Sequence, residues 1–268
     1  MGILNTTPDS FSDGGLYRSS QAAVDRAVQI FNEGAAIIDV GGESTRPGAT
    51  AVGEAEEMDR ILPVIESIVK RLDVAISVDT SKLAVMDAAV AAGACVVNDV
   101  NALRASGARE WAAKTSVGVC LMHKQGEPRA MQIKPEYQDV VSEVHAFLAN
   151  ERSLCITAGI APAAIVLDPG IGFGKSQLHN LQLLKELAHL TTLGAPVLVG
   201  VSRKNFIGNI LGRPVNERMF GGLGLAVLAV TEGAKIIRTH DIAATCDALR
   251  MVSAVMQSVA LKELKIDG

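Results

Sequence analysis

The residues best suited to chemistry in this chain stand at the ends of short apolar runs. Asp79 closes the run Ala75–Asp79 and Asp168 closes Ile165–Asp168, although a buried parallel strand favours Val and Ile. Polar side chains at the carboxyl ends of parallel strands lie on one face, which is the catalytic face of a barrel, and cations there could bind an anion. The polar residues at or near the run ends are Asn5, Asp39, Asp79, Asn98, His123, Asp168, Ser202, Lys204, Arg238 and His240.

The cations in this set indicate a local anion site. Arg238 and His240 are two residues apart, and alternation along a strand can place both side chains on one side. The net charge of the chain is -4, so anion binding has to be local, and a nucleic-acid or membrane-surface partner is not expected. Helix capping could explain one or two of the Asp and Asn residues, but it does not explain Lys204, Arg238 and His240.

The elements that position these residues are eight β-rich runs alternating with amphipathic segments. The runs are Gly2–Asn5, Ala36–Val40, Ala75–Asp79, Cys95–Asn98, Val117–Met122, Ile165–Asp168, Val197–Val201 and Ile236–Arg238. The amphipathic segments include Ala22–Glu33, Ala55–Arg71, Leu83–Ala92, Val140–Ile156 and Leu178–Leu190. Eight strand–helix units in 268 residues favour a closed barrel over an open sheet. We therefore predict an α/β fold, a single (β/α)8 TIM barrel over residues 1–268, with the active site at the C-terminal ends of the strands.

Two motifs that resemble nucleotide-binding loops fail. The segment Gly170–Gly174 is not G-x-G-x-x-G, and Gly174-Lys175-Ser176 resembles the end of a P-loop whose first Gly would stand where Pro169 is. A tight turn after a strand is one interpretation of this segment. We favour a backbone platform beside Asp168, with Phe173 as an apolar wall, because Asp168 closes an otherwise apolar strand.

The remaining composition indicates a cytoplasmic protein. No segment reaches the roughly 18 apolar residues of a membrane span, and the start shows no basic region followed by an apolar stretch. The four cysteines form no C-x-x-C pair and none stands beside a His at zinc spacing.

The loop sequences resemble those of the dihydropteroate synthases. The stretches Asn5–Gly15 and Asp39–Ala49 are similar to that family's two signature regions, and the similarity runs in order from Gly2 to about Met251. The resemblance implies a folate-pathway transferase that condenses 6-hydroxymethyl-7,8-dihydropterin diphosphate with p-aminobenzoate, releasing diphosphate and giving 7,8-dihydropteroate. It implies catalytic roles for Asp79, Lys204, Arg238 and His240.

The resemblance also assigns the substrate contacts. The pterin would be bound by Asp79, Asn98, Val100, Met122, Asp168 and Lys204, and the diphosphate by Asn5, Thr45, Ser202, Arg238 and His240. The p-aminobenzoate slot would consist of Phe11, Thr45, Arg46, Pro47, Gly172, Phe173 and Ser202. The implied cofactor is Mg²⁺, held by Asn5 and Asp13.

Two other functions stay open. A pterin-binding methyltransferase barrel shares the Asp–Asn pterin pocket but would not need Thr45–Gly48 or the pair Arg238 and His240. A non-catalytic pterin-binding paralogue is the second alternative. The resemblance further implies a homodimer formed by late barrel helices, where the small residues Gly221–Ala226 could allow close packing, and inhibition by sulfonamides.

Overall fold

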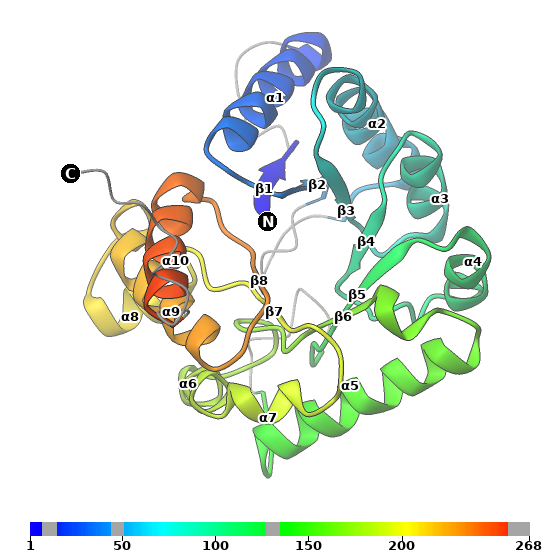
Figure 1. Ribbon diagram of the computed structural model, residues 1–268. Coiled ribbons are helices and arrows are strands. Elements are labelled where there is room, and N and C mark those ends of the chain that lie inside the picture. The colour runs from blue at the N-terminus through cyan, green and yellow to red at the C-terminus, as the bar shows by residue number, and fades with distance from the viewer. Residues whose placement is uncertain (7–14, 44–50, 127–134, 257–268) are drawn as a thin grey trace.

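Parallel strands form the centre of the molecule and helices surround them (Figure 1). The computed structural model describes residues 1–6, 15–43, 51–126 and 135–256. Every strand pair in this part of the chain is parallel, and neighbours in the sheet are neighbours in the sequence. The strands are β1 (Gly2–Asn5), β2 (Ile37–Gly41), β3 (Ala75–Asp79), β4 (Val96–Asp99), β5 (Gly118–Met122), β6 (Ile165–Asp168), β7 (Leu198–Val199) and β8 (Ile236–Ile237).

Two short contacts close the strands into a barrel. A parallel bridge joins Leu167 to Val197, and the Leu167 N–H donates to the Pro196 carbonyl at 2.9 Å, which connects β6 to β7. A second bridge joins Gly2 to Thr239, and the Ile3 N–H donates to the Thr239 carbonyl at 3.0 Å. The last strand therefore meets the first, and the predicted (β/α)8 barrel is confirmed.

The helices follow the strands in alternation. Those in the described part of the chain are α1 (Gly15–Asn32), α2 (Glu54–Arg71), α3 (Leu83–Ala91), α4 (Ala108–Thr115), α5 (Val140–Thr157), α6 (Gln177–Lys185), α7 (Leu187–Thr191), α8 (Asn205–Leu211), α9 (Met219–Thr231) and α10 (Ile242–Met256). Short 3₁₀ turns cover Pro162–Ala164 and Val215–Glu217. The segment predicted as one helix over Leu178–Leu190 is two, because the backbone of Glu186 leaves the helical region between α6 and α7.

Alternation along the strands separates an apolar outer face from a polar interior. Ile38, Val40 and Val78 are fully buried and belong to the hydrophobic core. The residues between them, such as Asp39 and Ser77, point the opposite way. Side chains of strands that are not adjacent meet there: the Asn98 Nδ2 atom of β4 donates to the Asp39 Oδ2 atom of β2 at 3.1 Å. The barrel interior therefore holds charged and amide groups.

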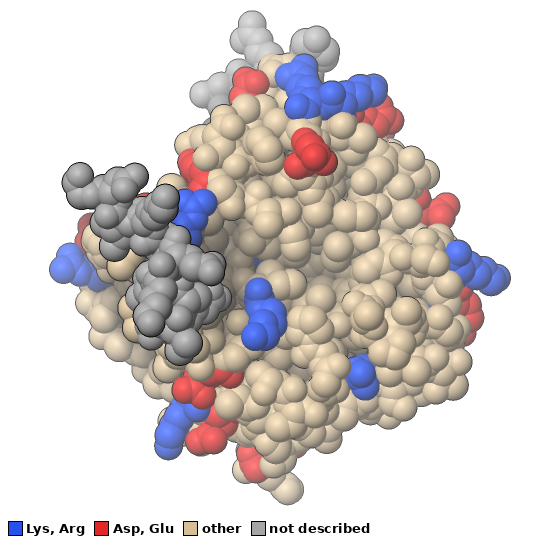
Figure 2. Space-filling model, in the orientation of Figure 1, with Lys and Arg blue, Asp and Glu red and all other residues tan. Residues whose placement is uncertain are grey.

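Surface charge shows no concentration of one sign on the visible face. Acidic and basic side chains are interspersed around the rim of the face in Figure 2, and basic charge also lies near its middle. No helix in the described ranges is long and apolar enough to cross a membrane.

Candidate active site

An ionic network forms the floor of the site. The Arg238 side chain follows β8, and its Nε donates to Asp39 Oδ2 at 2.6 Å while its Nη2 donates to Asp79 Oδ2 at 2.7 Å. Asp39, Asp79 and Asn98 are all buried. Since these residues come from β2, β3, β4 and the end of β8, the barrel brings together groups that are up to 199 positions apart in the sequence.

Burial dominates the electrostatics of this floor. It raises the pKa of Asp79 to about 7, against the opposing effect of Arg238 and with further increases from Asp39, Glu57 and Asp99. Burial alone lowers the pKa of Arg238, but Asp39 and Asp79 raise it above its ordinary value, so the guanidinium stays charged. Asp79 is therefore a carboxylate whose charge changes near neutral pH.

Asp168 lies at the end of β6, opposite Met122 of β5 in the strand register. Its Oδ1 accepts the Gly170 N–H at 2.7 Å, and burial raises its pKa, with Gly170 and Lys204 acting in the opposite direction. Gly170 has a φ of +65°, and a Cβ there would lie 1.9 Å from the His123 carbonyl oxygen. The loop after Asp168 thus needs glycine to lie this close to the loop after β5.

Lys204, Gly172 and Phe173 meet beside Asp168. The Lys204 Nζ lies 4.2 Å from the centre of the Phe173 ring, a cation–π distance. A Cβ on Gly172 would lie 3.1 Å from Lys204 Cδ. The absence of a side chain at Gly172 therefore leaves room for Lys204 to cross the platform. These contacts agree with the platform interpretation of Gly170–Gly174 and not with a nucleotide loop.

Lys175 stabilises the Gly170–Gly174 platform through hydrogen bonds to its backbone carbonyls. Its side chain is 2% exposed, and its Nζ lies 2.8 Å from His123 Nδ1 and donates to the carbonyls of Gly170 and Phe173, each at 3.0 Å. Burial lowers the pKa of Lys175 to about 7, and burial together with Lys175 lowers the pKa of His123 to about 3. Lys175, which in the sequence resembles the Lys of a P-loop, is thus a buried residue whose hydrogen bonds connect the loop after β5 to the loop after β6.

The lowered pKa of Lys175 has a measurable consequence. Between about pH 7 and its ordinary value of 10.5, unfolded Lys175 holds a proton that the folded form releases. The unfolded state therefore binds more protons, and stability rises with pH across this window. In Lys175→Met we expect the free energy of unfolding, measured by denaturant titration between pH 7.5 and 10, to rise less with pH. Lys185→Met, on an exposed helix end, is the matched control; equal slopes in all three proteins would contradict the assignment.

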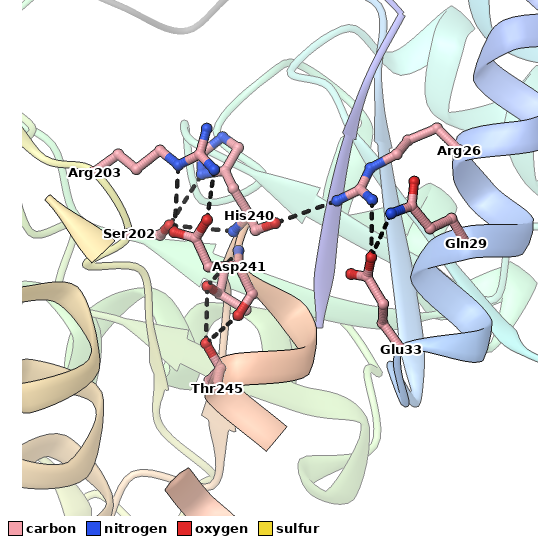
Figure 3. Close-up of polar contacts among 9 residues, drawn as sticks. Arg26, Gln29, Glu33, Ser202, Arg203, His240, Asp241 and Thr245 are labelled. Atoms are coloured by element: carbon pink, nitrogen blue, oxygen red, sulfur yellow. Dashed lines mark hydrogen bonds and ion pairs between the residues drawn. The ribbon is translucent and has the colours of Figure 1, made fainter. Parts of the chain in front are cut away.

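A second polar group surrounds His240 at the end of the barrel near β7 and β8 (Figure 3). The Ser202 Oγ accepts the His240 N–H at 3.1 Å and lies 3.1 Å from His240 Nδ1. Arg203 pairs with Asp241, and Arg26 of α1 donates to the His240 carbonyl at 3.3 Å. Ser202 and His240 therefore form a hydrogen-bonded pair, and the backbone of His240 is held by Ser202 and Arg26. The Arg238 side chain instead points to the acidic floor formed by Asp39 and Asp79.

The structure brings together most of the predicted site residues. Asn5 ends β1 opposite Gly41, and a Cβ on Gly41 would lie 3.8 Å from Asn5 Oδ1 and 3.5 Å from Asp79 Cβ. Val100 follows β4 and Met122 ends β5. Five predicted site residues lie outside the described residues: Phe11, Asp13, Thr45, Arg46 and Pro47. Their predicted roles stay predictions.

Two residues that organise this site, Asp39 and Lys175, are absent from the predicted catalytic and substrate contacts, although Asp39 was among the polar residues near the run ends. Asp39 was recognisable as a charge inside the apolar run of β2, a pattern that signals a buried ionic contact. Lys175 gave no such signal, because a Lys after a glycine-rich turn is usually exposed.

Comparison with known proteins supplies the family. Residues 1–240 match the family model described as "Pterin binding enzyme". The Escherichia coli K12 dihydropteroate synthase is 49% identical over 258 residues, which cover 96% of this chain and 92% of that protein. Among solved structures, the Xanthomonas albilineans dihydropteroate synthase with 4-aminobenzoic acid has a TM-score of 0.91 at 49% identity, covering 96% of this chain and 92% of that one. The Yersinia pestis dihydropteroate synthase in a sulfonamide drug complex has a TM-score of 0.91 at 47% identity, covering 96% and 94%. The chain belongs to the dihydropteroate synthases, which are pterin-binding transferases of folate biosynthesis.

Proposed function

We propose that this chain joins 6-hydroxymethyl-7,8-dihydropterin diphosphate to p-aminobenzoate at the C-terminal ends of the barrel strands. The observation that carries the assignment of the site is the convergence of Asp79, Asn98 and Asp168 on one end of the barrel. Lys204 lies beside them on the Gly172–Phe173 platform. A pterin presents N–H donors, a carbonyl and ring nitrogens along one edge, and these four side chains supply the complementary acceptors and donors.

Each pterin contact follows from the chemistry of its side chain. The Asp168 carboxylate accepts two parallel N–H bonds from the pterin, a geometry that suits a group with two acceptor oxygens. Asn98 contributes an amide to the neighbouring ring atoms, and Lys204 donates to the pterin carbonyl and ring nitrogen. Met122 and Val100 line the apolar walls. Asp79 stabilises positive charge that develops on the pterin.

The diphosphate leaves from the side of His240 and Ser202. Their mutual hydrogen bonds hold both groups near the last strand, and Asn5 and Thr45 complete the proposed contacts. Arg238 provides positive charge from the floor, where Asp39 and Asp79 hold it. Asn5 and Asp13 would hold Mg²⁺, which when bound neutralises part of the diphosphate charge. The Asn5 oxygen beside Gly41 fits this role, because Mg²⁺ prefers oxygen ligands and no side chain of Gly41 blocks the space.

The proposed reaction is a dissociative substitution. The C–O bond to the diphosphate breaks first and leaves a methylene cation conjugated with the pterin. The nitrogen of p-aminobenzoate then forms the new C–N bond and loses a proton. The proposed slot for the arylamine consists of Phe11, Thr45, Arg46, Pro47, Gly172, Phe173 and Ser202. No covalent enzyme intermediate is needed, so the site requires electrostatic stabilisation and positioning of the substrates.

Product analysis tests this function. The full chain should convert the pterin diphosphate and p-aminobenzoate to 7,8-dihydropteroate, detected by mass spectrometry, with one diphosphate released per product. Omission of p-aminobenzoate or chelation of Mg²⁺ should abolish or strongly reduce product. A folded chain that binds the pterin diphosphate and forms no product would instead indicate a non-catalytic paralogue.

Sulfonamides should inhibit the chain by occupying the p-aminobenzoate slot. The Yersinia pestis relative has been solved in a sulfonamide drug complex, and this chain has Phe173 and Gly172 on the proposed slot. We expect steady-state inhibition that p-aminobenzoate relieves competitively and that the pterin diphosphate does not relieve. Inhibition that is insensitive to p-aminobenzoate would place the drug elsewhere.

Self-association should involve the late helices α9 and α10. Phe220 of α9 is 77% exposed and Val255 of α10 is 68% exposed, and the two helices pack together. Gly221 is already used within the chain, because a Cβ there would lie 2.6 Å from Ile207 of α8, whereas Gly224 faces open space. We expect a light-scattering mass of twice the 28.0 kDa chain mass at micromolar concentration, and the monomer mass for Phe220→Glu. A monomeric wild-type chain would contradict this expectation.

A further inference from the structure

We propose that Asp39 is a positioning residue for the pterin site, whose carboxylate fixes the orientation of both Asn98 and Arg238. The inference deepens the proposed function, because it concerns how the same pterin floor is held in place. It rests on two hydrogen bonds to one buried carboxylate and on the depth of that carboxylate in the barrel.

Within the floor, Asp39 lies one layer deeper than Asp79. It is the third residue of β2, level with Ser77 in the register, whereas Asp79 is level with Gly41, two residues nearer the open end of the barrel. Two residues correspond to roughly 6.6 Å along a strand. Asp39 is fully buried, and its Oδ2 accepts from both Arg238 Nε and Asn98 Nδ2, at 2.6 and 3.1 Å. It therefore supports groups of the proposed site from beneath them.

The bond to Asp39 determines which end of the Asn98 amide is presented. An ionised carboxylate can only accept hydrogen bonds, so it binds the NH₂ end of the amide and not the carbonyl end. With Nδ2 held by Asp39, the Oδ1 acceptor of Asn98 points away from it. Asp39 thereby selects one of the two amide orientations, and the pterin meets an oxygen at a fixed place.

Arg238 is fixed by the same carboxylate together with Asp79. Its Nε and Nη2 bind carboxylates from two different strands, so the guanidinium plane spans β2 and β3. Loss of the Asp39 charge would leave Arg238 with one carboxylate on this floor. The isosteric change Asp39→Asn keeps the volume but removes the negative charge that pairs with Arg238. Its amide can also present either an oxygen or an NH₂ group to Asn98, so one orientation of the Asn98 amide is no longer enforced.

Calorimetric binding of the pterin diphosphate tests the inference. We expect Asp39→Asn to weaken binding by about tenfold per folded molecule, consistent with one mispaired buried polar contact. Ser77→Ala is the matched control: Ser77 lies at the same depth on the neighbouring strand, is fully buried, and its Oγ has no hydrogen-bond partner among the described residues. This control should bind the pterin as the wild type does.

A double-mutant cycle separates positioning from general stability. If Asp39 acts through Asn98, Asp39→Asn should add little to the loss caused by Asn98→Ala, whereas independent effects should multiply. Wild-type affinity of folded Asp39→Asn, or multiplicative effects in the cycle, would overturn the inference. Absence of pterin binding by the wild-type chain would instead refute the proposed function, so the two failures are distinguishable.

Discussion

Replacing Asp168 by Asn should weaken binding of the pterin diphosphate at least about tenfold while the barrel stays folded. The Asp168 Oδ1 already accepts the Gly170 N–H at 2.7 Å, so the amide oxygen of the variant will keep that bond. The new NH₂ group then faces the pterin donors, where the wild type offers an acceptor. A buried mismatch of this kind costs about 1–3 kcal/mol, and more where a charge is lost. Isothermal calorimetry of the folded variant measures the effect.

Asp99→Asn is the control for the loss of a buried carboxylate. Asp99 ends β4, beside Asn98, but its two oxygens accept the backbone N–H groups of Asn101 and Leu103 and do not enter the floor network. We expect lower stability and unchanged pterin affinity per folded molecule in this variant. If Asp168→Asn binds the pterin as tightly as the wild type, Asp168 is not the pterin acceptor.

Replacing Asp79 by Asn should lower kcat by about a hundredfold, the size of effect seen when one electrostatic stabiliser of a transition state is removed. Pterin affinity should fall far less, because the variant keeps an oxygen for Arg238 and loses chiefly the negative charge. Steady-state kinetics that separate kcat from KM make this comparison. A kcat within twofold of the wild-type value would remove Asp79 from the mechanism.

The pH profile gives a second test of Asp79. Burial raises its pKa to about 7, so its ionised fraction increases as the pH rises through neutrality. If the ionised form is the active one, kcat/KM of the wild type should increase across this range, since that ratio reports the free enzyme.

The same shift means that the folded protein takes up a proton at Asp79 below pH 7, so this group stabilises the fold at acidic pH and that contribution is lost as the pH rises. In Asp79→Asn, the increase of kcat/KM through neutral pH and the stabilisation of the fold at acidic pH should both disappear.

The barrel could be predicted from the sequence because its signals are local. Apolar runs such as Ile165–Asp168 alternate with amphipathic helices, and polar residues stand at or near the ends of the runs. The strand lengths near the end of the chain were predicted too long: the run Val197–Val201 contains only the two strand residues Leu198–Val199. Closure of the barrel depends on single bridges at Val197 and Thr239, which no local pattern specifies.

The side-chain network could be predicted only in part. Spacing and resemblance both grouped Arg238 with His240, but the structure turns Arg238 into the barrel toward Asp39, a partner 199 positions away. Strand alternation fixes the side of a strand on which a residue lies, and it does not fix the direction of a long flexible side chain. The partners of Lys175 are mostly backbone carbonyls, whose positions depend on the glycine conformations at Gly170 and Gly174.

A crystal structure of the chain with the pterin diphosphate and p-aminobenzoate or a sulfonamide tests the central claim most directly. We expect the pterin between Asp79, Asn98 and Asp168, with both Asp168 oxygens facing ring N–H donors at roughly 2.7–3.0 Å. We also expect Asn98 to remain bonded to Asp39 through Nδ2 and the arylamine to lie against Phe173. A pterin bound elsewhere, or with Asp168 beyond hydrogen-bond distance, would contradict the account.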